Sequence, residues 1–352
     1  MKKYLHKTQF ERVSVITVLF ILLSVSKLLA QDDMRYCSDS WNCTANDAGL
    51  DSVYLVADAI GTPLDNNVCT TADSIDAFIR GDIYVTAANR YDIAFYADLY
   101  VNGDSVGTVK KFAGDYTSGN YSINFGQIKW ACGDKLELRN IYVFWLQTKS
   151  AKLGRFHSCS EAYTTSKCRG TQGINKIITT PVTGYFNFTA CNNGSNNIAA
   201  TFIAYPAGGS EEYLYSWDFN SDGIEDSSDS IATYNSSKSS DNVTLTIIDA
   251  NDNSKFANIN ETVYYPDQIS ITGNVTCSNN TGSIDLTVTG GTPFNSSPAY
   301  NFEWKDENGT TISSNEDVDN LVNGVSYTVT VTDSAGCSAS ASYPVNCCEL
   351  TI

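Results

Sequence analysis

Histidine and basic side chains are scarce in this chain. It has two histidines among 352 residues, and its 22 Lys and Arg face 39 Asp and Glu, for a net charge of −17. Proteins that bind nucleic acid by neutralising phosphates need clustered basic residues, so that class is excluded. Histidine is also the side chain that most often moves protons near neutral pH. Since no nucleophile motif such as Gly-x-Ser-x-Gly accompanies either histidine, we expect no enzyme.

Long apolar runs are limited to the first 30 residues. A basic start is followed by the apolar run 13–25, and the segment ends on the small residue Ala30. This order is typical of a secretory signal peptide cleaved after Ala30. An uncleaved signal anchor is the less favoured alternative, because the run is shorter than the ~20 residues of a membrane span. Cleavage removes five basic residues and one acidic residue, so the net charge becomes −21, and no later stretch is long enough to span a bilayer.

Cysteine is abundant, and all 11 cysteines follow the signal peptide. In an exported protein they are expected to form disulfides, and their spacing lacks the close pairs of zinc sites. The odd number leaves at least one thiol free or paired with another chain. Six lie in the N-terminal part, where 15 connectivities are possible: Cys37, Cys43, Cys69, Cys132, Cys159 and Cys168.

Amphipathic helices longer than two turns are missing, whereas period-2 alternation is frequent. Ile284, Leu286 and Val288 alternate with polar residues, and the aromatic run 213–219 follows the same period. Turn signals such as Asn102-Gly103 separate these stretches. The pattern predicts half-buried antiparallel strands. We therefore expect an all-β protein, with tandem Ig-like β-sandwich modules after an N-terminal disulfide-bonded β-sandwich domain.

An internal repeat occupies the second half of the chain. Gly208-Gly209, Trp217 and a strand ending at Asp249 recur as Gly290-Gly291, Trp304 and a strand ending at Asp333. The offset is roughly 85 residues, close to the size of one Ig-like unit. Each copy is expected to bury its own core around its tryptophan.

The second copy, residues 277–345, resembles an SprB-type repeat of bacterial surface adhesins. The segments that carry this resemblance are Cys277, 282–293, Trp304, the turn 320–324 and the strand and turn 327–337. The first copy, residues 183–265, resembles a polycystic-kidney-disease (PKD) domain through 215–219 and 243–247. Residues 32–175 resemble a β-domain found ahead of such repeats. These resemblances imply a secreted, stalk-like or adhesive cell-surface protein, often exported by type IX secretion.

The resemblances and the prolines at 181 and 266 predict the domain organisation. The expected parts are a signal peptide (1–30), an N-terminal Cys-rich β-domain (31–178), a PKD-like Ig-fold module (179–267), an SprB-type Ig-like repeat (268–346), and a tail or the start of a further module (347–352). Cys277 and Cys337 fall at the two ends of the SprB-type module and are expected to pair. Cys191, Cys347 and Cys348 remain, and the odd cysteine is expected among them.

The most specific candidate site is the acidic stretch after Trp217. Oxygen-bearing side chains fall at positions 1, 3, 5, 9 and 12 of a loop with Gly223 at position 6, which is the spacing of an EF-hand-like calcium loop. The candidate Ca²⁺ ligands are Asp218, Asn220, Asp222, Ile224 through its carbonyl, Asp226 and Asp229. Because position 12 is Asp rather than the usual bidentate Glu, a weak site is expected, and since no helix pair flanks the loop, it would be an EF-hand-like loop within a β-domain. The alternative is a solvated hairpin tip.

A basic cluster surrounds His157 and consists of Lys149, Lys152, Arg155, Lys167 and Arg169. It is suited to anionic glycans or an acidic neighbouring module, although a solvated loop is the favoured interpretation.

The leading functional hypothesis is a non-enzymatic surface protein that acts in adhesion or as a subunit of an extracellular filament. Its expected partners are other surface proteins, like subunits or glycans. The alternative is a glycan-binding accessory module of a polysaccharide-degrading system, with Trp41, Trp130 and Trp145 stacking on sugars unless they fill cores. A hydrolase in residues 32–175 is a third, weaker possibility.

Overall fold

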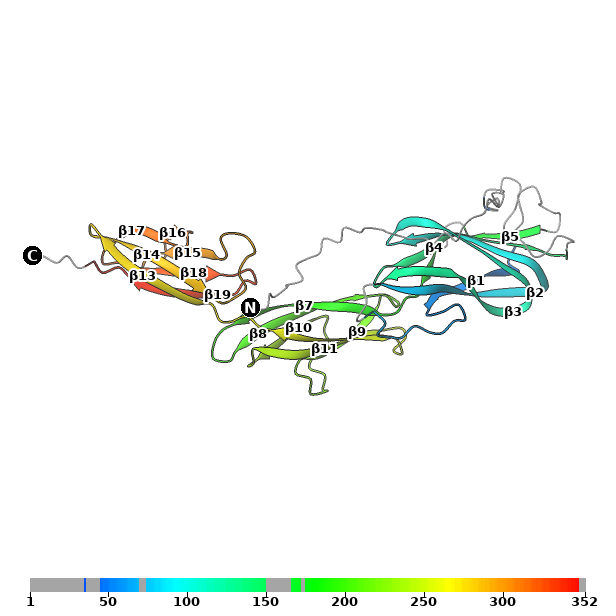
Figure 1. The fold of residues 1–352 in the computed structure, drawn as a ribbon, viewed down its shortest axis with the longest axis horizontal. Helices are drawn as coiled ribbons and strands as arrows, with labels where there is room; N and C mark the ends of the chain where they lie inside the picture. Colours follow the sequence, from blue (N-terminus) through cyan, green and yellow to red (C-terminus); the bar gives the residue numbers. More distant parts are fainter. Residues whose placement is uncertain (1–34, 36–44, 70–73, 150–165, 172–174, 348–352) are drawn as a thin grey trace, which may run out of the picture. The chain divides into compact units, whose positions relative to one another are not determined.

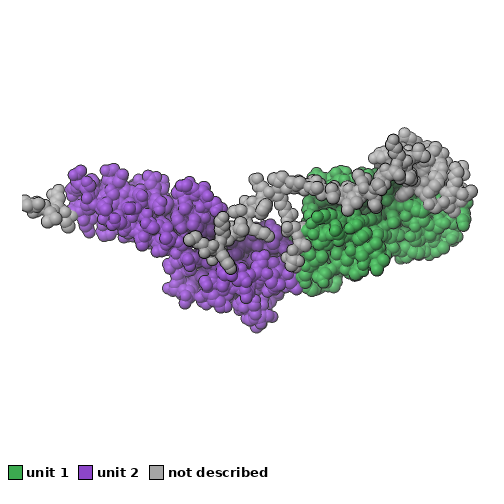
Figure 2. Space-filling view, in the orientation of Figure 1, with its two compact units in different colours: residues 1–183, 206–213, 248–257 green, residues 184–205, 214–247, 258–352 purple. Residues whose placement is uncertain are grey.

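The computed structural model describes residues 35, 45–69, 74–149, 166–171 and 175–347 (Figure 1). Its regular structure in these residues is β-strand, with no α-helix, which confirms the predicted all-β class. Contacts divide the chain into two compact units, coloured separately in Figure 2: unit 1 with residues 1–183, 206–213 and 248–257, and unit 2 with residues 184–205, 214–247 and 258–352. The predicted domain boundaries stay a prediction.

Unit 1 is built on a six-stranded antiparallel sheet. Its strands are β1 Ala48–Val56, β2 Ser74–Val101, β3 Asp104–Ala131, β4 Leu136–Leu146, β5 Ser166–Thr171 and β6 Lys176–Ile178. The order is β1-β2-β4-β5, with β3 on β2 and β6 on β4. The predicted turn at Asn102-Gly103 joins the two 28-residue strands β2 and β3, and both turn residues have positive φ, as a two-residue hairpin requires.

The long strand β2 pairs with β3 on one side and with two successive strands, β1 and then β4, on the other. β3 accompanies it throughout, whereas β1 pairs with residues 78–85 and β4 with residues 91–101. Register shifts interrupt both ladders, and such irregularities bend a strand. The sheet covers separate apolar clusters, one containing Trp130 and another containing Trp145, and both rings are almost fully buried.

The next part of the fold, here called the Trp217 sandwich, consists of two three-stranded sheets. One has the order β10-β8-β7 and the other the order β12-β11-β9. The strands are β7 Thr183–Asn192, β8 Ile198–Ala207, β9 Tyr213–Asp218, β10 Ile231–Ser236, β11 Ser240–Asp249 and β12 Phe256–Tyr264. Trp217 is fully buried and contacts the rings of Phe186, Phe202 and Phe219 at centroid distances of 5.4, 5.7 and 5.4 Å. The predicted aromatic strand therefore supplies this core.

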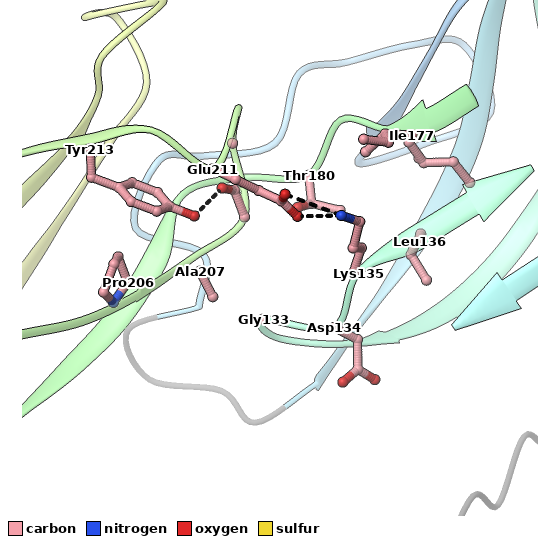
Figure 3. A pocket seen from close by; sticks show the side chains of 13 residues that line it. Gly133, Asp134, Lys135, Leu136, Ile177, Thr180, Pro206, Ala207, Glu211 and Tyr213 are labelled. Carbon is pink, nitrogen blue, oxygen red and sulfur yellow. Dashed lines mark hydrogen bonds and ion pairs between the residues drawn. The ribbon is translucent and has the colours of Figure 1, made fainter. Parts of the chain in front are cut away.

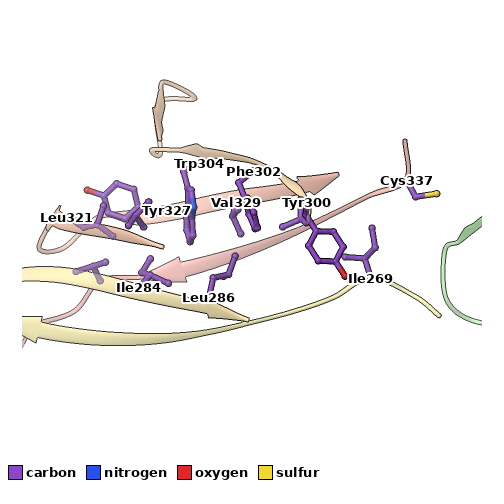
Figure 4. Packing of buried hydrophobic residues seen from close by; sticks show 13 residues of the cluster. Ile269, Ile284, Leu286, Tyr300, Phe302, Trp304, Leu321, Tyr327, Val329 and Cys337 are labelled. Atoms are coloured by element: carbon purple, nitrogen blue, oxygen red, sulfur yellow. The ribbon is translucent and has the colours of Figure 1, made fainter. Parts of the chain in front are cut away.

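The last part, here called the Trp304 sandwich, lies within unit 2 and has sheets of the order β13-β14-β17 and β16-β15-β18-β19. The strands are β13 Ser270–Ser278, β14 Thr281–Thr289, β15 Asn301–Lys305, β16 Thr311–Ser313, β17 Val318–Val322, β18 Ser326–Thr332 and β19 Ser338–Pro344. Figure 4 shows Trp304 and Phe302 of β15 packed with Val329 of β18 above Ile284 and Leu286 of β14. Burial alternates along β14, where Ile284 and Leu286 are buried between more exposed polar residues, as the sequence predicted.

The predicted signal peptide lies outside the described residues. Among the residues that the structure does describe, no helix is long and apolar enough to cross a membrane.

Candidate functional site

The predicted calcium loop connects β9 to β10, and its first half is organised by Asp218. The Oδ1 of Asp218 accepts the backbone N–H groups of Asn220 and Asp222 at 3.2 and 3.3 Å, and Oδ2 accepts that of Gly223 at 2.9 Å. Burial alone would raise the pKa of Asp218, but these backbone hydrogen bonds outweigh it and hold the pKa below its ordinary value. Gly223 has a φ of +80° and open space around it, so the sharp bend expected at position 6 is present.

The second half of the loop folds back on Trp217. Asp226 Oδ2 accepts the N–H of Phe219 at 2.7 Å, and the Trp217 indole N–H donates to the carbonyl of Asp229 at 2.8 Å. In the part of the chain that the structure describes, no group of three or more His, Cys, Asp or Glu side chains is arranged to hold a metal ion. The loop has the predicted bend but does not gather its carboxylates, so calcium binding stays a prediction.

Two sets of residues form the same arrangement, one in each unit. Junction 1, in unit 1, consists of Thr180, Pro181, Gly208, Gly209, Tyr213 and Asp249. Junction 2, in unit 2, consists of Asp267, Gln268, Gly290, Gly291, Tyr300 and Asp333.

In junction 2, a buried carboxylate ties two loops together. Asp333 is 2% exposed, and its Oδ2 accepts the N–H of Thr292 at 2.7 Å while its Oδ1 accepts the N–H of Cys337 at 2.9 Å. The Tyr300 hydroxyl donates to the carbonyl of Gly290 at 2.8 Å. Burial, followed by the nearby Asp333, raises the pKa of Tyr300, so its hydroxyl stays protonated as a donor.

Junction 1 repeats these contacts with different neighbours. Asp249 is 1% exposed and accepts the N–H groups of Ser210 and Asn251 at 2.7 and 2.9 Å, and Tyr213 donates to the carbonyl of Gly208 at 2.6 Å. Burial alone would raise the pKa of Asp249, but the hydrogen bonds from Ser210 and Asn251 outweigh it and hold the pKa below its ordinary value.

The glycine pairs are required because the preceding segment passes directly over them. Gly209 and Gly291 donate to the carbonyls of Thr180 and Asp267 at 3.1 and 2.8 Å. A Cβ on Gly208 would overlap the carbonyl oxygen of Pro181, and a Cβ on Gly290 would overlap that of Gln268. The sequence revealed this repeat of Gly-Gly and Asp, but the contact with the incoming chain segment could not be seen without the fold.

The predicted disulfide between Cys277 and Cys337 is wrong. The structure joins Cys191 to Cys337 and Cys277 to Cys347. Cys337 is held at junction 2 before β19 begins, whereas Cys277 lies at the far end of β13, which starts at junction 2. The two cysteines are separated by the length of a strand, roughly 25 Å, and a disulfide needs Cα atoms within about 7 Å.

The other cysteines are bonded or lie outside the described residues. Cys69 pairs with Cys132 in unit 1, and Cys168 is also disulfide-bonded. The remaining four, Cys37, Cys43, Cys159 and Cys348, lie outside the described residues. The prediction that the cysteines are mainly structural agrees with the bonded ones.

A cavity of about 320 Å³ in unit 1 borders junction 1 (Figure 3). Lys135 and Glu211 form an ion pair across it at 2.8 Å, and this hydrogen bond raises the pKa of Lys135. Leu136, Ile177 and Ala207 contribute apolar lining. Since the Gly-Gly pair and Tyr213 line the same cavity, it belongs to the junction.

Part of the predicted basic cluster, Lys152, Arg155 and His157, lies outside the described residues. On β5, the Arg169 guanidinium lies over the Tyr84 ring and donates to its hydroxyl. Arg169 is thus engaged within unit 1. Trp130 and Trp145 are 1% and 0% exposed, so neither forms a platform for a sugar, and Trp41 lies outside the described residues.

Comparison with known families identifies one segment. Residues 269–309 match the SprB repeat family. This part of the chain carries an SprB repeat. The match spans β13, β14 and β15 of the Trp304 sandwich, and it confirms the SprB part of the resemblance. The PKD resemblance of the preceding copy stays a prediction, and a search of curated proteins found no match to the chain.

The SprB repeat and the disulfides together indicate an extracellular surface protein. The SprB repeat is a surface repeat rather than an enzyme family.

Proposed function

We propose that this chain is a secreted, non-enzymatic cell-surface protein that acts in adhesion or as a subunit of an extracellular filament. The observation that carries the proposal is the SprB repeat at 269–309, set in a disulfide-stapled β-sandwich. Edge strands such as β13 and β19 add support, because an edge offers backbone groups for pairing with another chain.

The test begins with the intact host cell. Surface labelling with a membrane-impermeant reagent, followed by protease treatment of whole cells, is expected to detect and remove the protein. Cells lacking the gene are expected to attach less well to surfaces. A protein that resists both treatments, or unchanged attachment, contradicts the adhesion proposal.

The filament version has its own test. Size analysis of the mature chain with and without Ca²⁺ and reductant is expected to show assembly in at least one condition. A monomer in all four conditions counts against the filament and leaves adhesion as the remaining version.

Calcium binding by the loop 218–229 is part of the proposal. Its support is the ligand spacing, the bend at Gly223 and the exposed loop backbone. Calorimetry of the mature chain with Ca²⁺ is expected to show a weak site that Asp222→Ala removes. Identical heats for the native chain and the variant would sink the calcium proposal without touching adhesion.

The alternative function, glycan binding, has one observation in its favour. Tyr185 of β7 and Tyr205 of β8 stack at a centroid distance of 4.9 Å and are 50% and 39% exposed. Exposed aromatic faces suit the apolar faces of sugars. A glycan array on the native chain and on Tyr185→Ala/Tyr205→Ala tests this. Specific binding that the double variant loses favours the alternative, and no binding to any glycan removes it.

A further inference from the structure

The two disulfides of unit 2 interlock along the chain. Cys191, near the end of β7, joins Cys337 across a sequence separation of 146 residues. Cys277, near the end of β13, joins Cys347 across a separation of 70. Since 277 lies between 191 and 337 and 347 lies beyond both, neither loop is nested in the other. A short covalent path therefore leads from β7 through Cys337 and β19 to Cys347, and it omits residues 192–336.

We propose that this path is a covalent load-bearing route that keeps tension off residues 192–336, which include the buried Trp217 and Trp304. When the chain is pulled between β7 and Cys347, force runs along β7, crosses the Cys191–Cys337 disulfide and continues along β19. The proposal rests on the adhesion or filament role proposed above, because a protein that attaches a cell to a surface is pulled along its length.

The two strands on this route are suited to tension. Both β7 and β19 are edge strands of their sheets. Force enters β7 through the backbone and leaves it through Cys191, and it enters and leaves β19 beside Cys337 and Cys347, so each strand is stretched along its own backbone rather than sheared from β8 or β18. An extended strand already rises about 3.3 Å per residue, close to the maximum of about 3.6 Å, so little length remains to be released.

The central tryptophan of each sandwich lies off this route, although Phe186 of β7 and Tyr343 of β19 pack against these tryptophans from the route itself. Trp217 and Trp304, both fully buried, belong to the residues between Cys191 and Cys337. Forced unfolding is governed by the rate at which a loaded module crosses its unfolding barrier. The segment between two bonded cysteines experiences no such load while the bond holds.

The disulfide that carries the load is sheltered at Cys337, whereas Cys191 is partly buried. Cys337 is 8% exposed and its sulfur lies 3.3 Å from the carbonyl oxygen of Ala190. Thiol–disulfide exchange needs access of the attacking thiolate to a sulfur, so burial slows reduction.

The two disulfides are not equivalent on this route, so removing each one in turn predicts a different extension of the chain. Without Cys191–Cys337, tension follows the backbone to Cys277 and then crosses to Cys347, so residues 192–276 become extensible. Without Cys277–Cys347, the route through Cys191–Cys337 remains complete. Only the first disulfide protects the Trp217 sandwich, and either one protects most of the Trp304 sandwich.

Single-molecule force spectroscopy of the full mature chain, held at its two termini, tests this. The native oxidised chain is expected to show no extension event from residues 192–336. Cys191→Ser/Cys337→Ser is expected to add an event of roughly 300 Å, at roughly 3.5 Å per residue. The matched control Cys277→Ser/Cys347→Ser is expected to add none. Extension of the residues before Cys191 is common to the native chain and both variants and serves as an internal reference.

A second measurement needs no variant. Reduction of the native chain is expected to release residues 192–346, roughly 550 Å, in addition to the residues freed when Cys69–Cys132 is reduced. An oxidised native chain that already releases roughly 500 Å, or equal events in the two double variants, overturns the proposal. Because no cell or ligand takes part, these outcomes are independent of the attachment assays, so failure of the load route and failure of the adhesion proposal are distinguishable.

Discussion

Replacing Gly290 by alanine tests the idea that junction 2 needs a residue without a Cβ. Gly290 has a φ of +79°, and a Cβ there would overlap the backbone carbonyl oxygen of Gln268. Gly309, in the same sandwich, has a φ of +78° and nothing within 4 Å of its Cβ position. Gly309→Ala is therefore a matched control for backbone strain without the overlap.

The two variants share one energetic cost and differ in another. Alanine in the left-handed region costs about 1–2 kcal/mol at either position. At Gly290 the segment carrying Gln268 must also move by about 1 Å or more to reach even a close C···O contact, since such contacts lie near 3.3–3.6 Å. Overpacking of this kind costs about 1–3 kcal/mol, and loss of the Gly291–Asp267 hydrogen bond adds about 1 kcal/mol.

Hydrogen exchange is the suitable assay because a chain of several modules has no single unfolding free energy. The amides of β18, paired with both β15 and β19, report opening of the Trp304 sandwich. A difference of about 2–4 kcal/mol predicts that Gly290→Ala lowers their protection roughly 30- to 1000-fold more than Gly309→Ala does. Equal losses of protection in the two variants would refute the steric role of the junction.

Two further predictions concern buried carboxylates. Because the folded pKa of Asp249 is depressed, its ionised form contributes stability above the unfolded pKa of about 3.9 that is lost as the pH falls through the folded pKa. In Asp249→Asn, the stability around Asp249, measured by hydrogen exchange, should therefore depend less on pH below pH 5 than in the native chain, and an unchanged pH dependence contradicts this. The Tyr265 hydroxyl donates to the buried Asp241 at 3.2 Å, and burial followed by Asp241 raises the pKa of Tyr265. Tyr265→Phe should lower the opening free energy of the Trp217 sandwich, measured by hydrogen exchange of the β11 amides, by about 1.5–3 kcal/mol. The exposed neighbour Tyr264→Phe should lower it by less than about 0.5 kcal/mol, and similar losses would argue against the buried pair.

Local patterns in the sequence were sufficient for the elements and their cores. Alternation along 284–288 predicts the buried face of β14, and Asn102-Gly103 predicts the hairpin between β2 and β3. Trp217 and Trp304 were expected at core centres, and both are fully buried. These features depend on neighbours within a few residues, which a single sequence displays.

Local sequence patterns could not predict which distant segments meet, and the disulfide partners are the example. Cys277 and Cys337 fall at the two ends of one module in sequence, and in space they also lie at opposite ends of its sandwich. Their partners are set by which strand ends meet, and this depends on the assembled sheets. Composition and spacing say that disulfides form, but not which cysteines meet.

The two junctions share their Gly-Gly and Asp contacts, but only junction 2 also carries a disulfide, Cys191–Cys337. In junction 1, Asp249 donates its N–H to the carbonyl of Lys255, and in junction 2, Asp333 donates its N–H to that of Cys337. Lys255 and Cys337 thus occupy the same place in the two turns, yet only the second turn carries a cysteine. The shared glycines and aspartate hold the turn, and that hold places the backbone N–H of Cys337 on Asp333. The hydrogen bonds of Asp333 therefore position Cys337, which links Cys191 to β19. Removing the Asp333 carboxylate should displace Cys337 from its place opposite Cys191 before it breaks any core contact.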